Sequence, residues 1–455
     1  MALKKEEGQT LVEKKRKCSE QGVLASECVK LFLVSHPDEV DAPNSASVNP
    51  VSVCIDQLIG EGGKIYGYED VQISIWFNII SFLAYVNITF IRKFDSGKGI
   101  TDLEYAFQNI FGKSMMMDKN EFIQTFFSKS SSISDVLSAG PVVNIYADTS
   151  ETRVEVIRMN LSCTSVGLLY NYLTPLILLF IEGSSPVDIT DPNWEIYFVV
   201  KTRLGFKTED IRFKILGFST TYRFYHYPAS YRLRISQILV LPTYQRQGHG
   251  CHLLESINSV AISQNYHDVT VEEPSDYLQH LRTSIDVVRL FGFKPIDAAM
   301  IPSLSLLNEV ELLKIAKKFK LNPPADLVSA VSENLKINKK QLLRCWEVLI
   351  YLKLDPEKKI CFDNFNACMF NRVKADVIGK EAEADRYYRK RLVEMCDLYS
   401  FTMLKYKDDS ADGEKNDLED EIVKRFELQL NQLVLERIEQ IAEDAKKVML
   451  HHSAH

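Results

Sequence analysis

A short turn rich in glutamine, arginine and glycine carries residue types that suit the binding of an anion. It lies in the stretch RISQILVLPTYQRQGHGCHLLESI, which starts at Arg234, between an apolar run and a helical pattern. A strand would therefore deliver the chain to the first turn of a helix, whose N–H groups and dipole attract negative charge. Gly248 and Gly250 allow a ligand to approach the backbone closely, and Arg246 adds a positive charge suited to pyrophosphate. On the turn alone, a strand-to-helix connection that binds no ligand is the simpler interpretation.

The turn differs from two well-known phosphate-binding motifs. It lacks the Lys-Ser/Thr ending of a P-loop, and its order, QRQGHG, is not the GxGxxG of dinucleotide-binding proteins. Chemistry on nucleoside triphosphates is therefore disfavoured.

Two adjacent carboxylates, Glu272 and Glu273, are a second candidate for chemistry. They stand in DVTVEEPS, which we expect to form a strand from Asp268 that ends at Pro274. Neighbouring residues of a strand point to opposite faces, so one of the two should face a given cleft. A carboxylate in a cleft can act as a general base, but an exposed pair at a strand end is the interpretation that the residues alone favour.

Four strands and one helix must position these residues. The helix is expected from His249 to about Ser263, because its apolar residues recur at helical spacing. Short turns separate the strands, so antiparallel pairing of neighbours is the natural connection. The strands are expected at Trp194–Thr202, Ile211–Phe218, Thr221–Tyr227 and Arg234–Leu241.

Further elements are expected on both sides of this segment. Strands are predicted within Val71–Ile91 and around Asn144–Ile157, where β-branched and aromatic residues gather. After Phe293 the pattern is helical to the end. Its last part carries an apolar stripe typical of a docking helix or a short coiled coil, formed by Leu418, Ile422, Phe426, Leu430, Leu433, Ile438 and Ile441.

Leu161–Ile181 has no charged residue and is long enough to span a bilayer. Polar residues interrupt it, however, and Pro175 would kink a continuous helix. The stretch therefore predicts a buried core helix plus a strand, and no membrane span.

The composition is that of an ordinary globular protein with a moderately acidic surface. Of 455 residues 46% are apolar and 25% are charged, and 54 Lys and Arg against 61 Asp and Glu give a formal net charge of −7. This balance argues against direct binding of nucleic acid and suits a cationic substrate. Nine cysteines without a CxxC pair predict no metal site and the reduced thiols of an intracellular protein.

Three motifs resemble one family of enzymes. QRQGHG matches the Q/R-x-x-G-x-G/A signature of the GNAT acetyltransferase superfamily, in which this turn holds the pyrophosphate of acetyl-coenzyme A (acetyl-CoA). The longer stretch RISQILVLPTYQRQGHGCHLLE, together with VTVEEPS and FIEGSSPVDITDPNW (Phe180–Trp194), resembles the catalytic subunits of type B histone acetyltransferases. The similarity extends from about residue 48 to about residue 348 and is strongest over residues 180–282.

The resemblance implies an α+β fold with a GNAT core, which is a mixed and mostly antiparallel sheet flanked by helices. A strand-rich N-terminal domain and a helical C-terminal domain are expected beside it. The expected parts are a polar, disordered tail (1–45), an N-terminal α+β domain (46–160), the acetyl-CoA-binding catalytic domain (161–298), a helical domain (299–406), and a charged linker with a C-terminal helix (407–455).

The resemblance also assigns roles to site residues. Acetyl transfer to a lysine needs a neutral amine, whose pKa is about 10.4 when free, so a general base is expected. Glu272 matches that base, Glu273 stands where relatives have aspartate, and Glu182 matches a third acid of the site. The backbone at Ile238, Leu239 and Val240 matches the positions that hold the pantetheine arm and the acetyl group. The pyrophosphate is expected at Gln245, Arg246, Gln247, Gly248, His249, Gly250 and Cys251.

Two residues leave the course of the reaction open. Tyr277 is a candidate to protonate the leaving thiolate. A covalent route through Cys251 would need a nearby base that the sequence does not identify, so direct transfer is preferred.

Contacts to a histone tail follow from the same resemblance. Trp194, Tyr222, Arg223 and Phe224 match histone-contact positions, although relatives have a polar residue where Arg223 stands. The loop of Glu61, Gly62 and Gly63 aligns with an acidic loop from which two acids are missing here. We therefore expect weaker electrostatic capture of a basic peptide.

The sequence thus predicts a type B histone lysine N-acetyltransferase that uses acetyl-CoA, without a metal, on the N-terminal tail of new histone H4. The alternatives are a GNAT enzyme that acetylates another protein or a small amine, and a histone-binding escort protein without activity. A WD-repeat histone-binding subunit is the expected partner, with no direct contact to nucleic acid or membrane. The expected location is the nucleus and the cytoplasm, and Lys14–Lys17 is either an import patch or part of a solvated tail.

Overall fold

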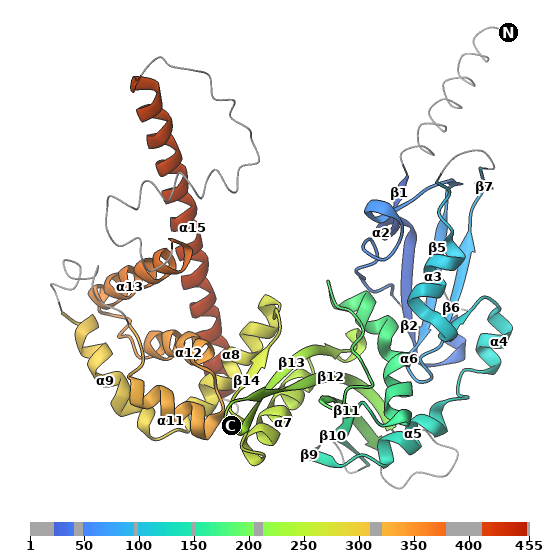
Figure 1. Ribbon diagram of the computed structural model, residues 1–455, viewed down its shortest axis with the longest axis horizontal. Coiled ribbons are helices and arrows are strands. Elements are labelled where there is room, and N and C mark those ends of the chain that lie inside the picture. Colours follow the sequence, from blue (N-terminus) through green and yellow to red (C-terminus); the bar gives the residue numbers. More distant parts are fainter. Residues whose placement is uncertain are drawn as a thin grey trace. The chain divides into compact units, whose positions relative to one another are not determined.

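Two compact units make up the protein, and Figure 1 shows their helices and strands. The computed structural model describes residues 22–40, 49–94, 99–147, 151–203, 213–309, 321–378 and 412–452. Unit 1 comprises Met1–Glu273, and unit 2 comprises Pro274–His455. Unit 1 contains sheets and helices, and the named elements of unit 2 are helices, so the predicted α+β class is confirmed.

The first large sheet of unit 1 has four strands. β2 (Val29–Val34) and β5 (Gln72–Asn78) are parallel, β6 (Ala84–Thr89) runs antiparallel to β5, and β8 (Met115–Met116) is parallel to β6. β5 and β6 confirm the strands predicted within Val71–Ile91. β2 corrects the expected tail, because the apolar run VKLFLV buries five of its six side chains in this sheet. Residues 1–21, with Lys14–Lys17, and residues 41–45 lie outside the described residues.

Shorter elements surround this sheet. They are β1 (Val23–Leu24), α2 (Ala25–Cys28), β3 (Lys64–Ile65), β4 (Tyr68–Glu69), β7 (Arg92–Lys93), α3 (Leu103–Phe111), α4 (Lys119–Gln124) and α5 (Ser130–Ser138). Asp102 and Asp118 cap α3 and α4 by accepting hydrogen bonds from the backbone N–H groups of Tyr105 and Glu121.

A second sheet of unit 1 has six strands in the order β14-β13-β12-β11-β10-β9. Its strands are β9 (Val142–Ala147), β10 (Thr152–Asn160), β11 (Trp194–Arg203), β12 (Phe213–His226), β13 (Ser230–Val240) and β14 (Val269–Val271). Neighbours are antiparallel except for β13 and β14, which α7 (His249–Ser263) connects in sequence. This is the mixed, mostly antiparallel sheet that we expected. The sheet also includes β9 and β10, which lie in the stretch 46–160 that we expected to form a separate N-terminal domain.

β12 corrects a second expectation. Ile211–Phe218 and Thr221–Tyr227 were expected as separate strands, but the chain runs straight from Phe213 to His226. Ser219 and Thr220 do not turn, because their hydroxyl groups donate hydrogen bonds to the main chain and side chain of Gln237 and can therefore stay buried. Ile211 and Arg212 lie outside the described residues.

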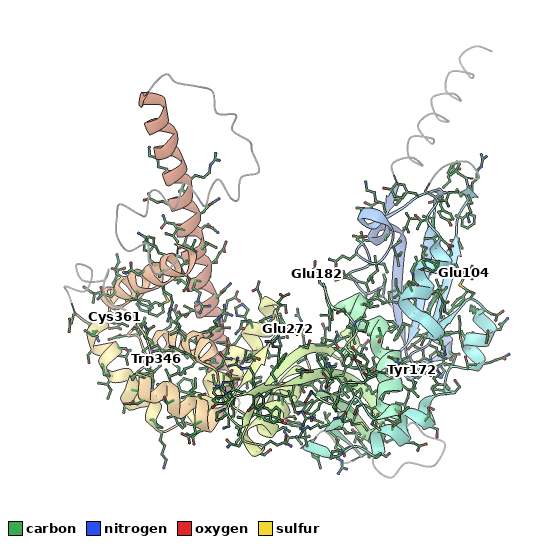
Figure 2. All side chains as sticks on the ribbon, in the orientation of Figure 1. Glu104, Tyr172, Glu182, Glu272, Trp346 and Cys361 are labelled. Carbon is green, nitrogen blue, oxygen red and sulfur yellow. The ribbon has the colours of Figure 1, made fainter. Side chains whose placement is uncertain are left out.

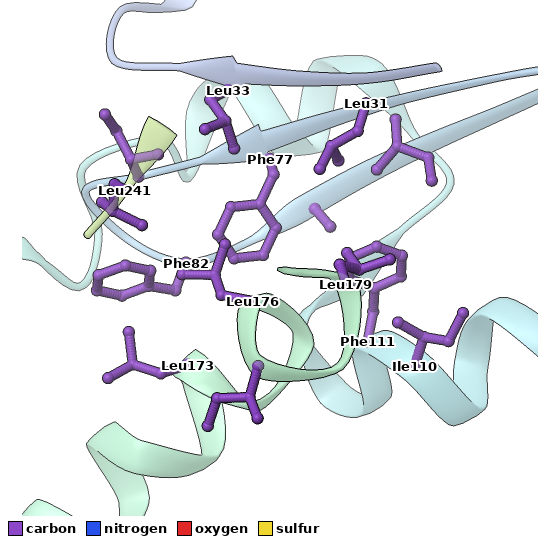
Figure 3. Close-up of a cluster of buried hydrophobic side chains, with 14 of the residues drawn as sticks. Leu31, Leu33, Phe77, Phe82, Ile110, Phe111, Leu173, Leu176, Leu179 and Leu241 are labelled. Atoms are coloured by element: carbon purple, nitrogen blue, oxygen red, sulfur yellow. The ribbon is translucent and has the colours of Figure 1, made fainter. Parts of the chain in front are cut away.

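α6 (Thr164–Phe180) joins the two sheets through one apolar core. Figure 3 shows Leu173, Leu176 and Leu179 of α6 beside Phe77 and Phe82. The helix continues through Pro175, so the predicted core helix is present but the predicted strand is not. Burial of nine of its residues outweighs the hydrogen bond that proline cannot make.

No single helix of the described chain is both long and apolar enough to cross a membrane. The pair α8 (Asp276–Phe291) and α9 (Pro295–Leu307) meets the length and composition test jointly, with a bend of 104° between its members.

Unit 2 is built from helices that begin at Asp276, earlier than the sequence pattern indicated. After α8 and α9 come α11 (Ala325–Leu335), α12 (Lys339–Leu352), α13 (Lys359–Ile378) and α15 (Asp412–His452). Trp346 of α12, labelled in Figure 2, is fully buried in their core. Glu347 is buried beside it and accepts hydrogen bonds from Arg372 of α13 and Arg437 of α15.

α15 confirms the predicted docking helix, because it packs on α8, α12 and α13. Leu430 and Ile441 of the predicted stripe are buried, whereas Leu433 is exposed and its neighbour Val434 is buried in its place. The side chains of Leu418, Ile422 and Phe426 lie outside the described residues. Residues 412–417 of the expected linker belong to the helix, and residues 379–411 lie outside the described residues.

Candidate active site

The candidate site is organised by the place where β13 and β14 separate. The parallel pairing of these strands covers three residues of each and ends at Ile235 and Val271. One more hydrogen bond follows, from the N–H of Glu272 to the carbonyl oxygen of Ile235, at 2.9 Å. Glu273 then has a positive φ of 37°, so the chain turns away. We call this separation the fork; beyond it, no strand of the described chain pairs with Ser236–Val240 on that side.

A β-bulge at Ser236 decides which backbone groups point into the fork. Thr220 pairs with Gln237 and Thr221 with Ile235, so Ser236 is the extra residue. The carbonyl oxygen of Gln237 accepts from the hydroxyl of Ser219, on β12. Since strand residues alternate, the N–H groups of Ile238 and Val240 face the fork, while that of Leu239 faces β12.

The glutamine-rich turn follows directly and is held by its own side chains. A short 3₁₀ turn, Pro242–Tyr244, leads into it. Gln245 donates a side-chain hydrogen bond to the carbonyl oxygen of Val240 at 3.0 Å, and Gln247 donates one to that of Thr243 at 3.3 Å. These bonds leave Arg246 exposed, with a positive φ of 60°.

α7 then starts with features that suit an anionic ligand. Gly248 precedes the helix with φ of 87°, a left-handed conformation that glycine adopts without strain. It provides no side-chain cap, and the first turn carries no acidic side chain. Buried Leu253, Leu254 and Ile257 anchor the helix on the sheet. The helix dipole at this start therefore favours a bound anion such as a pyrophosphate.

Cys251 is a poor nucleophile in this setting. Burial, and to a lesser extent the nearby Glu255 carboxylate, raise the pKa of its thiol to about 11. At neutral pH the thiol is protonated, and only the thiolate attacks a thioester. The local electrostatics thus agree with the preference for direct transfer.

Glu272 lies at the fork, immediately after the end of β14. The strand ends at Val271 and not at Pro274, so Glu272 and Glu273 both stand in a bend after it. The Glu272 side chain is 47% exposed. Its Oε2 accepts a hydrogen bond of 2.7 Å from the hydroxyl of Ser236, and its Oε1 lies 3.9 Å from Nη1 of Arg234. Glu273 is exposed.

Glu182 comes to this region on the loop that follows α6. Its Oε1 accepts a hydrogen bond of 3.2 Å from Gln57. The loop is tied to β13 by Gln237, whose amide donates to the hydroxyl of Ser184 at 3.2 Å and to the carbonyl oxygen of Ser185 at 2.8 Å. Figure 2 labels Glu182, on the loop after α6, and Glu272, directly after β14.

The predicted histone-contact residues divide into two groups. Trp194 and Tyr222 pair across β11 and β12 and have their ring centres 4.8 Å apart, and Phe224 follows at 4.5 Å from Tyr222. The guanidinium of Arg234 lies 4.4 Å from the centre of the Phe224 ring, so this aromatic row reaches the neighbour of Glu272. Arg223 is apart from the row, because strand residues alternate, and it donates to the carbonyl oxygen of Pro192.

The loop Glu61–Gly63 lies close to Gln57, the hydrogen-bond partner of Glu182. A 3₁₀ turn spans Glu61–Gly63, and a Cβ at Gly63 would come within 2.7 Å of Asp56. Asp56 directly precedes Gln57, which hydrogen-bonds Glu182. The loop and Glu182 are thus held by one segment. The side chain of Glu61 lies outside the described residues. Tyr277 belongs to unit 2, where it stands exposed in the first turn of α8.

Sequence reasoning missed the residues that hold the acids in place. These are Gln57, Arg234, Ser236 and Gln237. The alternation of Arg234 and Ser236 on β13 was visible in the sequence, but the pairing of β13 with β14 and the bulge were not.

Comparisons with known proteins find relatives over nearly the whole chain. The family profile described as "Histone acetyl transferase HAT1 N-terminus" matches residues 22–182. The histone acetyltransferase type B catalytic subunit of Zea mays is 42% identical over 436 residues, which cover 94% of this chain and 91% of that protein. The Arabidopsis thaliana protein of the same description is 41% identical over 445 residues, with 94% and 93% covered.

Among solved structures, an aminoglycoside acetyltransferase from an uncultured soil metagenomic sample, in complex with sisomicin, is 18% identical to this chain. The match covers 27% of this chain and 78% of that one, with a TM-score of 0.21.

Proposed function

The chain belongs to the family of type B histone acetyltransferase catalytic subunits, and from this premise we propose that it transfers the acetyl group of acetyl-CoA directly to lysines in the N-terminal tail of newly synthesised histone H4. Family membership makes the protein an acetyltransferase with acetyl-CoA as co-substrate and a histone as substrate. The identity of the histone and the absence of a covalent enzyme intermediate are the parts that we propose.

The fork is the observation that carries this proposal. It presents the N–H groups of Ile238 and Val240 on one strand and the carboxylate of Glu272 at the end of the other. The uncapped start of α7 follows the same strand. One side of the fork therefore suits a thioester with a pyrophosphate, and the other side suits a base.

In the proposed reaction, Glu272 accepts a proton from the lysine ammonium, directly or through one water molecule. The neutral amine attacks the thioester carbonyl carbon, and the N–H groups of Ile238 and Val240 stabilise the negative charge that develops on its oxygen. The C–S bond then breaks, and the attacking nitrogen releases its second proton to solvent, so that a neutral amide remains on the lysine. Coenzyme A leaves as a thiolate that takes a proton from solvent.

The surroundings of the fork support a basic peptide as the acceptor. Glu182, Glu272 and Glu273 supply negative charge, which attracts the lysine ammonium. The row formed by Trp194, Tyr222 and Phe224 offers flat apolar surfaces on which aliphatic stems of lysine and arginine can pack. A WD-repeat histone-binding subunit that presents the tail, and a distribution between nucleus and cytoplasm, complete the proposal on the basis of the family resemblance.

The test is an incubation of the purified protein with acetyl-CoA and a full-length histone mixture, read by mass spectrometry. Acetylation confined to lysines of the H4 tail is expected. Glu272→Gln keeps the shape of the side chain and removes the base, so we expect kcat to fall by about 10²-fold or more at neutral pH. Full activity of this variant would refute the base assignment. Histone binding without acetylation by the unmodified protein would instead support an escort role.

A further inference from the structure

We propose that Ser236 is a positioning residue that holds the Glu272 carboxylate in the orientation in which it takes up the lysine proton. This rests on the proposed function of Glu272. The proposed role requires no contact between Ser236 and either substrate, because Ser236 acts through the Glu272 carboxylate.

The bulge places the Ser236 hydroxyl where it reaches Glu272. A regular strand would pair Ser236 with a residue of β12, but here it is the unpaired extra residue between Gln237 and Ile235. Its side chain lies on the half-exposed face of β13, as does that of Arg234 two positions earlier. From there its Oγ donates a hydrogen bond of 2.7 Å to Oε2 of Glu272.

Glu272 needs such a partner because its own segment constrains it weakly. It stands after the last residue of β14, its side chain is half exposed, and it has three rotatable bonds. A hydrogen bond that fixes Oε2 leaves Oε1 to accept the proton. Arg234 is 3.9 Å from Oε1, beyond hydrogen-bond distance, and a partly exposed ion pair of this kind orients a carboxylate weakly.

Gln237, the residue after Ser236 on β13, also helps to position an acidic residue of the site. Gln237 binds the loop that follows Glu182, while Ser236 binds Glu272. Two adjacent side chains at the bulge thus hold two predicted acids of the site. Ser236 holds Glu272 directly, and Gln237 holds the loop that carries Glu182.

The test compares Ser236→Thr with Ser236→Val, which have nearly the same shape and differ in the hydroxyl group. Both β-branched side chains suit a strand. We expect kcat of the valine variant to be about tenfold below that of the threonine variant, with KM for acetyl-CoA equal. Ser230→Ala, on the same strand, is the control and should leave both quantities unchanged.

The double variant Glu272→Gln with Ser236→Val separates the possible failures. If Ser236 acts through Glu272, the valine change lowers the residual activity of Glu272→Gln no further. An equal loss in both backgrounds, or equal kcat values of Ser236→Thr and Ser236→Val, would overturn the positioning role while leaving Glu272 as the base. Full activity of Glu272→Gln alone would overturn the proposed function itself. Thermal unfolding of each variant verifies that the fold is kept.

Discussion

Gly217 of β12 is predicted to be essential for the geometry of the fork, although it touches no substrate. It pairs with Val240, and a Cβ built on it would lie 2.6 Å from the carbonyl oxygen of Leu239 and 2.9 Å from the Cα of Val240. Both are backbone atoms, so no side chain can rotate away. To reach an ordinary contact of 3.4 Å, β13 would have to move by about 0.8 Å.

The expected effect of Gly217→Ala has two parts. Overpacking costs about 1–3 kcal/mol, and alanine recovers about 0.5–1 kcal/mol of backbone entropy, so the free energy of unfolding should fall by about 1–2 kcal/mol. The displaced strand also carries the N–H group of Val240. A shift near 1 Å at a reacting group lowers kcat/KM by up to about 10²-fold.

The assays are denaturant unfolding, followed by circular dichroism, and steady-state kinetics with acetyl-CoA as the varied substrate. Gly292→Ala is the matched control, because Gly292 has φ of −75° and the nearest atom to its added Cβ lies at 3.6 Å. It should be neutral or slightly stabilising. An unfolding midpoint and a kcat/KM of Gly217→Ala equal to those of the unmodified protein would refute the argument.

Three further predictions concern other parts of the chain. Gly250→Glu places a carboxylate in the first turn of α7 and should weaken the binding of acetyl-CoA by at least about tenfold in calorimetric titration. Gly250→Ala should weaken it less, because a methyl group obstructs the approach of the pyrophosphate but does not repel its charge. With its thiol pKa raised to about 11, Cys251 is thiolate to about one part in a thousand at pH 8, so it should react with iodoacetamide far more slowly than a free cysteine, and Cys251→Ala should keep its activity. Glu347→Gln removes the buried anion that Arg372 and Arg437, both largely buried, surround, so the free energy of unfolding should fall by about 3–5 kcal/mol. An unchanged value would show that the cluster does not stabilise unit 2. The control is Glu443→Gln, an exposed residue of α15, the helix that carries Arg437; it should cost less than about 1 kcal/mol.

The sequence predicted the elements whose signals are local. α7 matches its predicted limits, His249 to Ser263, because its apolar spacing is complete within the helix itself. β5, β6, β9 and β10 follow in the same way from runs of β-branched and aromatic residues. The errors arise where a distant partner decides the outcome. Ser219 and Thr220 look like turn residues until Gln237 accepts their hydrogen bonds, and Pro175 looks like a helix end until the surrounding core is known.

The site shows the same division. The anion-binding character of QRQGHG could be read from its residue types, and the geometry of α7 and Gly248 agrees with it. The hydrogen bond between Ser236 and Glu272 could not be predicted, because it depends on a parallel pairing of three residues and on a bulge. Neither leaves a pattern in a single strand.

The hydrogen bonds of Gln237 also determine where protons can travel. Its Oε1 accepts from the hydroxyl groups of Tyr170 and Thr220, and its Nε2 donates both hydrogens to the loop after Glu182. Tyr170 in turn accepts from the N–H of Val187, so its own hydrogen stays directed at Gln237. A hydroxyl group can switch between donor and acceptor, but the oxygen of an amide only accepts and its nitrogen only donates. Every hydrogen in the row of Tyr170, Thr220 and Gln237 therefore has a fixed direction. Gln237 therefore interrupts proton transfer at this place: a proton taken up by the acids at the fork has no relay through this row into the core of unit 1.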